Sequence, residues 1–282
     1  MTVLANKIDF EVLVSVKLAN ANGDPLNGNR PRTDYNGLGE ISDVCIKRKI
    51  RNRMQDMGCK IFVQSDERAD DGCKSLSERA NNLLGKIKEK GVYAETACKE
   101  WIDVRSFGQV FTFKSKDKNG GVSVGVRGPV SIHQAVSVNP VEVQSMQITK
   151  SVNGEPAEGK GSDTMGMKHM VRFGLYVIKG SINVQLAEKT GFTEEDAEII
   201  KECLRSLFDN DASSARPDGS MEVCKLYWWK HNCRDGQYSS AKVHRLVNVS
   251  LKNGVEIAND FNDYDVVLNS LPDLECEEIE GK

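Results

Sequence analysis

Residues 8–18 read "IDFEVLVSVKL" and have the alternation that is typical of a β-strand. Apolar side chains recur at every second position: Ile8, Phe10, Val12, Val14, Val16 and Leu18. Because successive side chains of a strand point to opposite faces of a sheet, we expect a strand with one buried face and one free face. Residues 19–40, "ANANGDPLNGNRPRTDYNGLGE", are rich in turn-forming residues and predict a long loop.

Residues 42–58, "SDVCIKRKIRNRMQDMG", predict a helix with an unusual concentration of positive charge. Ser42 is a favourable N-cap, and Gly58 is a favourable stop. The side of the helix that should face the core carries Ile46, Ile50, Met54 and Met57. A second side gathers Lys47, Arg48 and Arg51, and we expect Lys49 and Arg53 to lie elsewhere on the surface. The formal net charge of the chain is −3, so this cluster is a local exception.

The rest of the chain mixes strand and helix patterns. Strands are predicted over residues 60–64, 130–150, 169–186, 221–232 and 242–254, and helices over residues 75–91, 95–108 and 193–207. A hairpin is predicted over residues 113–126, a flexible arm over 151–168 and a solvated acidic tail over 272–282. Without the insertions the order is β-α-β-β-α-β, which predicts an α+β, ferredoxin-like fold like that of RNA-recognition domains.

The composition argues against several classes of protein. With 282 residues, 39% hydrophobic and 28% charged, the chain is typical of a soluble globular protein. It has no run of 18 apolar residues and no signal-peptide pattern, so the expected compartment is the cytoplasm. The eight cysteines form no C-x-x-C pair, and the spacing of Cys224, His231 and Cys233 matches no zinc motif. We therefore expect no metal and no other cofactor.

Motifs of catalysis are missing as well. The sequence contains no nucleophile elbow, no zinc-protease motif and no phosphate-binding loop of the Walker type. The acids closest to the basic segments are better explained by structural roles: Asp34 forms a turn, Asp43 starts a helix and Asp103 is an ion-pair partner on a helix surface. The chain is therefore expected not to be an enzyme.

The cations leave two interpretations open. Lysines and arginines on a helix are commonly just a solvated face. However, Arg30 and Arg32 lie in the preceding loop beside asparagine donors, and a phosphodiester chain binds several fixed cations and amide donors. The arm is equally ambiguous: it is either a disordered loop or a contact in which Met165 and Met167 wedge against bases.

Four blocks of the sequence, taken in order, resemble a known family. They are "NANGDPLNGNRPRTDYNGLGEISDVCIKRKIRN" (20–52), "DVRSFGQVF" (103–111), "RGPVSIHQAVSVNPVE" (127–142) and "DTMGMKHMVRFGLYVIKGSIN" (163–183). They resemble the backbone subunit of the type I-C CRISPR Cascade effector complex, which belongs to the repeat-associated mysterious protein superfamily. The resemblance extends from about residue 8 to residue 232.

The resemblance implies one elaborated domain over residues 1–282, shaped like a hand. A ferredoxin-like palm would comprise about residues 8–58, 130–150 and 169–254, with a finger insertion at about 59–129, a thumb hairpin at about 151–168 and an acidic tail at 272–282. Copies would stack head-to-tail in a helical filament along one CRISPR RNA. Each copy would present guide bases to target DNA in antiviral defence, within a cytoplasmic ribonucleoprotein that contains the other Cascade subunits.

The resemblance also implies particular contacts. The expected RNA-binding residues are Asn22, Arg30, Arg32, Ser42, Lys47, Arg48, Arg51, Ser106, Phe107, Gln109, Thr164, Met165, Met167, Lys168 and His169. The expected contacts to target DNA are Lys114, Lys116 and Lys118. Two alternatives stay open: a target-RNA endonuclease that uses Asp34, and a protein-interaction module whose basic face meets an acidic partner.

Overall fold

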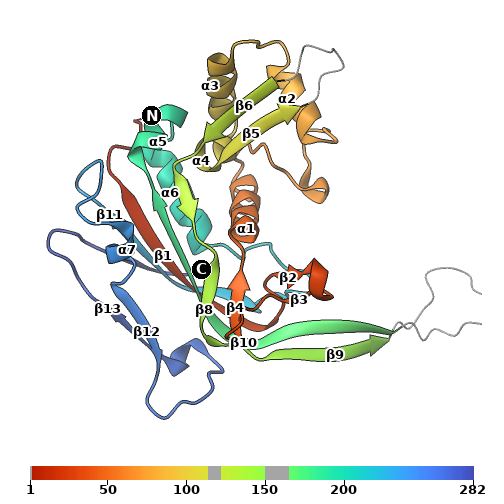
Figure 1. Ribbon diagram of the computed structural model, residues 1–282, viewed down its shortest axis with the longest axis vertical. Coiled ribbons are helices and arrows are strands. Elements are labelled where there is room, and N and C mark those ends of the chain that lie inside the picture. Colours follow the sequence, from red (N-terminus) through yellow and green to blue (C-terminus); the bar gives the residue numbers. More distant parts are fainter. Residues whose placement is uncertain (1, 114–121, 150–164) are drawn as a thin grey trace, which may run out of the picture.

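The computed structural model describes residues 2–113, 122–149 and 165–282 (Figure 1). Its centre is an eight-stranded antiparallel sheet with the order β14-β11-β1-β10-β8-β4, in which β7 and β9 also pair with β10. The strands of this sheet are β1 (Ile8–Ala19), β4 (Leu38–Ile41), β7 (Val130–Ile132), β8 (Ala135–Pro140), β9 (Val143–Thr149), β10 (Met165–Ile182), β11 (Met221–Lys230) and β14 (Glu277–Glu280). Together with the helices, this sheet confirms the predicted α+β class.

The strand β1 lies between β10 and β11, and both of its faces are buried. The face with Phe10 and Val12 belongs to the main apolar core. The opposite face carries Leu13, in a second apolar cluster with residues of α7 (Ser240–Val243), β12 (Val247–Leu251) and β13 (Tyr264–Leu268). The expectation of a free face was therefore wrong, because the C-terminal hairpin covers it. Leu18 also leaves the predicted stripe, since its backbone is left-handed and its side chain is 48% exposed.

Two helices, α1 (Asp43–Asp56) and α6 (Glu194–Arg205), belong to the core on the first face of the sheet. Both begin as predicted: the Ser42 side chain caps α1, and Thr193 forms a capping box with Asp196 at α6. The predicted core residues of α1 are buried, apart from Met57, which follows the last helical turn and is 40% exposed. A short helix, α5 (Val184–Thr190), replaces the end of the strand that was predicted to reach residue 186.

Residues 59–127 form an insertion unit with its own apolar cluster, built around Phe62, Trp101 and Phe111. It contains η2 (Asp66–Arg68), α2 (Leu76–Leu84), α3 (Lys90–Glu100), α4 (Ile102–Phe107), β5 (Gly108–Phe113) and β6 (Val122–Arg127). The predicted hairpin is confirmed as β5 and β6. The strand predicted over 60–64 is wrong, because those residues form no strand pairing. The two predicted helices have other limits: the first ends at Leu84, and the second is broken at Trp101, whose backbone is extended.

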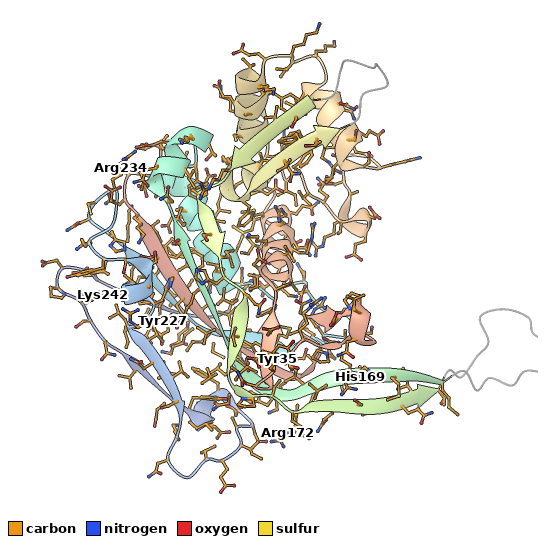
Figure 2. The ribbon with its side chains drawn as sticks, in the orientation of Figure 1. Tyr35, His169, Arg172, Tyr227, Arg234 and Lys242 are labelled. Carbon is orange, nitrogen blue, oxygen red and sulfur yellow. The ribbon has the colours of Figure 1, made fainter. Side chains whose placement is uncertain are left out.

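An arm formed by β9 and β10 projects from the body (Figure 1). Residues 165–168, the part of the predicted arm that the structure describes, belong to a strand that pairs with β9 and are not irregular; residues 150–164 lie outside the described part. Arg172 fastens the root of the arm: it pairs with Glu142 at 3.1 Å and donates to Asn259 Oδ1 at 2.7 Å. Figure 2 shows Arg172 near this root and His169 farther out.

The C-terminal residues are not a solvated tail, as the sequence predicted. The strand β14 pairs with β11, and Lys225 of β11 forms ion pairs with Glu278 and Glu280. The strand predicted over 242–254 is confirmed only at β12, and β13 was missed. Two minor strands, β2 (Gly23–Asp24) and β3 (Arg30–Pro31), with η1 (Pro25–Asn27) between them, order the loop after β1, and η3 (Phe261–Asp263) precedes β13. Among the described residues, no helix is long and apolar enough to cross a membrane.

Candidate nucleic-acid interface

The loop after β1 is fixed to the start of α1. Asn22 Oδ1 accepts hydrogen bonds from both the backbone nitrogen and the hydroxyl of Ser42, each at 2.9 Å. The Ser42 hydroxyl in turn accepts from the backbone nitrogen of Cys45 at 3.3 Å. The backbone nitrogen of Arg32 donates to the carbonyl oxygen of Asn22 at 3.1 Å. Three of the predicted RNA-binding residues, Asn22, Arg32 and Ser42, therefore meet at one helix N-terminus, which favours negative charge.

Two partly exposed cations lie at this end of α1. Lys47 pairs with Asp43 at 2.9 Å and Arg32 with Asp24 at 3.5 Å, and their side chains are 23% and 38% exposed. Ion pairs of this kind contribute about 0–1 kcal/mol, so a phosphate can replace the carboxylate at little cost. Arg30 is half-buried in β3, opposite Asp24.

The other two cations of the predicted stripe turn toward the insertion unit. Arg48 donates to the carbonyl oxygen of Val63 at 2.7 Å. Arg51 pairs with Asp103 at 2.9 Å, and its guanidinium carbon lies over the ring of Phe107, 5.0 Å from the ring centroid. Burial, and next the positive charge of Arg51, lower the pKa of Arg48. These two arginines join α1 to the insertion unit, so their first role is structural.

Lys49 and Arg53 are buried, and the prediction that they lie on the surface was wrong. Lys49 pairs with Asp211 and lies over the ring of Phe208. Burial lowers its pKa, and the charge of Asp211 opposes this shift. Arg53 donates to Ser206 Oγ at 3.2 Å. The partners belong to the segment that directly follows α6, which packs against this side of α1.

The acids have the structural roles that were predicted, with one difference. Asp34 Oδ1 accepts from the backbone nitrogens of Asn36 and Leu38, both at 2.8 Å, as a turn former does. Asp43 lies in the first turn of α1. Asp103 is an ion-pair partner, but it is fully buried and not on a helix surface. Its carboxylate also accepts from the backbone nitrogens of residues 62 and 63.

The residues predicted to bind RNA in the block 103–111 lie partly or wholly below the surface. Ser106 is fully buried, so its hydroxyl does not line a surface as expected. Its backbone lies close against Gly128, which follows β6. Phe107 is half-buried beneath Arg51. Gln109 is half-buried and donates from Nε2 to the carbonyl oxygen of Val110 at 3.1 Å.

The predicted arm residues divide between the two faces of the hairpin. The register places Met165, Met167 and His169 on one face and Lys168 on the other. Met165 and Met167 are 65% and 56% exposed, and His169 contacts Ser145 Oγ through Nδ1 at 2.9 Å. Thr164 and the lysines expected to contact DNA, Lys114, Lys116 and Lys118, lie outside the described residues.

The structure adds exposed residues that the sequence analysis missed. Met146 and Ile148 of β9 are 45% and 49% exposed and share the face of Lys168. Met146 and Ile148 alternate with polar residues within a predicted strand, and this pattern could have indicated them. Tyr35 is fully exposed on the turn that Asp34 forms, and Figure 2 shows it near the arm. An exposed aromatic ring is suited to stacking on a base.

A large antiparallel sheet, two packed helices, a cationic helix start and a projecting arm define a mixed α/β protein with a candidate polyanion-binding surface. The family model of the CRISPR-associated protein Cas7 matches residues 6–269. The chain therefore belongs to the CRISPR-associated protein Cas7 family, and the predicted backbone-subunit family is confirmed.

Two known proteins illustrate the similarity. A CRISPR-associated protein Cas7 of Haloferax volcanii is 27% identical over 234 residues, which cover 77% of this chain and 68% of the relative. A chain of a solved CRISPR RNA-guided surveillance complex, pre-nicking, has a TM-score of 0.50 and 16% identity, with coverage of 89% of this chain and 84% of that chain. At 16% identity, this structural similarity shows a shared fold.

Proposed function

We propose that this chain is the guide-binding backbone subunit of a CRISPR effector complex of type I-C. The observation that carries the proposal is the start of α1, where Asn22 holds Ser42 and where Lys47 and Arg32 are partly exposed and weakly paired. Such a site binds the phosphates of a strand without contacting base edges, so the bases stay free to pair with target DNA. Membership of the Cas7 family supports the same role.

The palm of the proposed hand is ferredoxin-like. Taken alone, β1, α1, β7 with β8, β10, α6 and β11 follow the order β-α-β-β-α-β. The adjacency of β11, β1, β10 and β8 in the sheet supports this proposal. In the same scheme the insertion unit is the finger, and the β9–β10 arm is the stem of a thumb. Copies would stack head-to-tail along one guide, beside the other subunits of the complex.

The proposed role is that of a scaffold, not of a nuclease. The carboxylate of Asp34, the candidate for cleavage, is engaged in its own turn. Within the described residues, no group of three histidine, cysteine or acidic side chains is arranged to hold a metal ion. Both observations favour binding without chemistry.

The test measures binding of a single-stranded RNA to the variant Lys47→Ala with Arg32→Ala over a range of salt concentrations. We expect weaker binding and a salt dependence reduced by about 1.4, because log K falls by about 0.7 per phosphate neutralised for each unit of log salt. Arg51 is not replaced, since its loss leaves the buried carboxylate of Asp103 without its guanidinium.

The matched control is Lys99→Ala with Arg234→Ala. Lys99 pairs with Glu95 at i,i+4, as Lys47 pairs with Asp43, and Arg234 pairs with Glu188 on the surface. This control should bind as the unchanged protein does. Equal affinities of the two double variants for RNA would contradict the proposal. If the protein purifies without RNA and with an acidic protein bound to this surface, the alternative of a protein-interaction module is favoured.

A further inference from the structure

The segment between α6 and β11, residues 206–220, packs against the loop that follows β1. The backbone nitrogen of Asn20 donates to the carbonyl oxygen of Ala215 at 2.9 Å. The backbone nitrogen of Lys17 donates to the carbonyl oxygen of Ser220 at 2.8 Å. Arg216 is further held by a tight turn, in which its backbone exchanges hydrogen bonds with Ser213. The position of Arg216 beside the cationic helix start is therefore fixed by the backbone.

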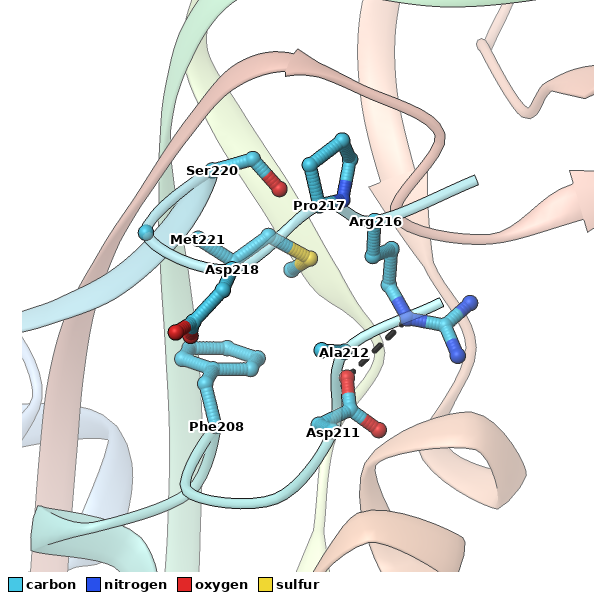
Figure 3. A pocket seen from close by; sticks show the side chains of 9 residues that line it. Phe208, Asp211, Ala212, Arg216, Pro217, Asp218, Ser220 and Met221 are labelled. Atoms are coloured by element: carbon cyan, nitrogen blue, oxygen red, sulfur yellow. Dashed lines mark hydrogen bonds and ion pairs between the residues drawn. The ribbon is translucent and has the colours of Figure 1, made fainter. Parts of the chain in front are cut away.

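The guanidinium of Arg216 is only partly engaged. Its Nε donates to Asp211 Oδ2 at 3.0 Å, and its side chain is 28% exposed. In Figure 3 the two terminal nitrogens point away from Asp211. Within the part of the chain that the structure describes, those two nitrogens have no hydrogen bond or ion pair, so both are available for a bidentate contact to an anion.

Arg216 is joined to α1 through a shared acid. The carboxylate of Asp211 is shared between Arg216 and the buried Lys49, so two cations face one acid. Lys49 belongs to α1, and Ala215, which precedes Arg216, accepts from Asn20, two residues before Asn22, so Arg216 lies beside the loop that meets the start of α1. Asp218 also lines the depression beside Arg216, so an anion contact depends on the outward terminal nitrogens of Arg216 and not on a surplus of positive charge.

The shape of the surface excludes a small enclosed ligand. The depression beside Arg216, lined by Phe208, Asp211 and Pro217 among others, has a volume of about 10 Å³ (Figure 3). That is the space of a single water molecule. Arg216 is therefore reached from the open surface, where an extended chain of phosphates can contact it.

From these contacts we infer that Arg216 is a further ligand for the RNA phosphates, which extends the track of Lys47 and Arg32 across the start of α1 to residues 206–220. This inference rests on the proposed guide-binding function. Asp211 is a positioning residue, because it holds the Nε side of the guanidinium and leaves the terminal nitrogens outward. The ligand is the sugar–phosphate chain of single-stranded RNA, recognised without regard to sequence.

The experiment compares Arg216→Ala, Arg216→Lys and the control Arg205→Ala in binding one single-stranded RNA oligonucleotide across a salt series. Arg205 is a fitting control, since it is similarly exposed and pairs with Glu202 on α6. Arg216→Ala should weaken binding about tenfold and reduce the salt dependence by about 0.7. Arg216→Lys should keep the salt dependence but lose part of the affinity, because an ammonium cannot replace a bidentate fork. Thermal melting of each variant confirms that it is folded.

The possible outcomes separate this inference from the proposed function. If Lys47→Ala with Arg32→Ala weakens binding while Arg216→Ala retains the affinity and salt dependence of the unchanged protein, only the role of Arg216 is wrong. If the unchanged protein does not bind RNA, both fail. A loss of affinity in Arg205→Ala equal to that in Arg216→Ala also overturns the inference, since it would reflect net charge alone.

Discussion

Arg51 and Lys47 lie one turn apart on α1, yet their surroundings give them different tasks. Lys47 pairs with an acid that is 42% exposed, whereas Arg51 pairs with Asp103, which is fully buried. A buried carboxylate requires its partners, because an uncompensated charge in the interior costs several kcal/mol. Arg51 therefore stabilises the junction with the insertion unit, and Lys47 remains available for a ligand.

Glu11 is a buried carboxyl that makes stability depend on pH. It is 1% exposed on the second face of β1, and burial raises its pKa to about 8, against the smaller opposing effect of Lys179. A carboxyl with a raised pKa holds its proton more tightly in the folded chain. It therefore costs stability progressively as the pH rises from about 4.5, its ordinary pKa, to about 8. Glu11→Gln should abolish this loss and should be more stable by about 4 kcal/mol at pH 8, since each pKa unit corresponds to about 1.4 kcal/mol.

Urea unfolding of both proteins at about pH 5 and pH 8 measures this difference. The control is Glu222→Gln, which changes an exposed carboxyl on the neighbouring strand β11 and should follow the unchanged protein. Parallel pH profiles for Glu11→Gln and the unchanged chain would show that the buried carboxyl is not responsible.

The helix α1 shows which features of an element can be predicted from sequence. Its capping residue and the buried Ile46, Ile50 and Met54 follow from local spacing, and all were predicted correctly. The burial of Lys49 and Arg53 was not, because their partners are supplied by residues 206–211, more than 150 positions away in the chain. Periodicity reports which side is apolar, but it cannot report which carboxylates will be packed against a cation.

The same limit explains the errors on β1 and β14. Asp9 and Glu11 look like residues of a solvated face, yet both are buried. Asp9 pairs through Oδ2 with Lys7 and with His231, at 2.9 Å and 2.8 Å. The acidic C-terminal residues suggested a free tail because their partner, Lys225, lies on a strand far from them in sequence.

The strand β14 protects an edge of the main sheet, and its removal should destabilise the protein. It pairs with β11 over four residues, and Lys201 pairs with Glu277 at 2.9 Å. A chain that lacks residues 275–282 should lose about 2 kcal/mol, from the missing cross-strand contacts, and should self-associate through the exposed edge of β11. Thermal melting and sedimentation velocity measure the two effects.

The variant Glu278→Ala with Glu280→Ala keeps the strand and removes only the ion pairs of Lys225. It should stay monomeric and lose less stability than the shortened chain. If the shortened chain melts at the same temperature as the unchanged protein and does not self-associate, β14 makes no measurable contribution to the stability of the sheet.

The net charge of the whole chain says little about its function, whereas local clusters of charged residues say more. A net charge of −3 does not indicate nucleic-acid binding, whereas the cations beside a loop rich in asparagine do. The structure retains Lys47 and Arg32 in that surface and assigns Arg48 and Arg51 to internal contacts. The sequence could not indicate Arg216, because only folding brings it beside the loop that precedes α1.

The proposed head-to-tail stacking predicts that the length of the RNA sets the size of the assembly. A contact between two different surfaces of one subunit does not close on itself, so each bound copy offers a place for the next. Native mass spectrometry with RNAs of increasing length should therefore show copies added in regular steps, one for each fixed increment of RNA. The variant Lys47→Ala with Arg32→Ala should show fewer bound copies at every length, because its phosphate site is weakened. A constant number of copies on short and long RNAs would contradict the filament, even if binding itself were tight.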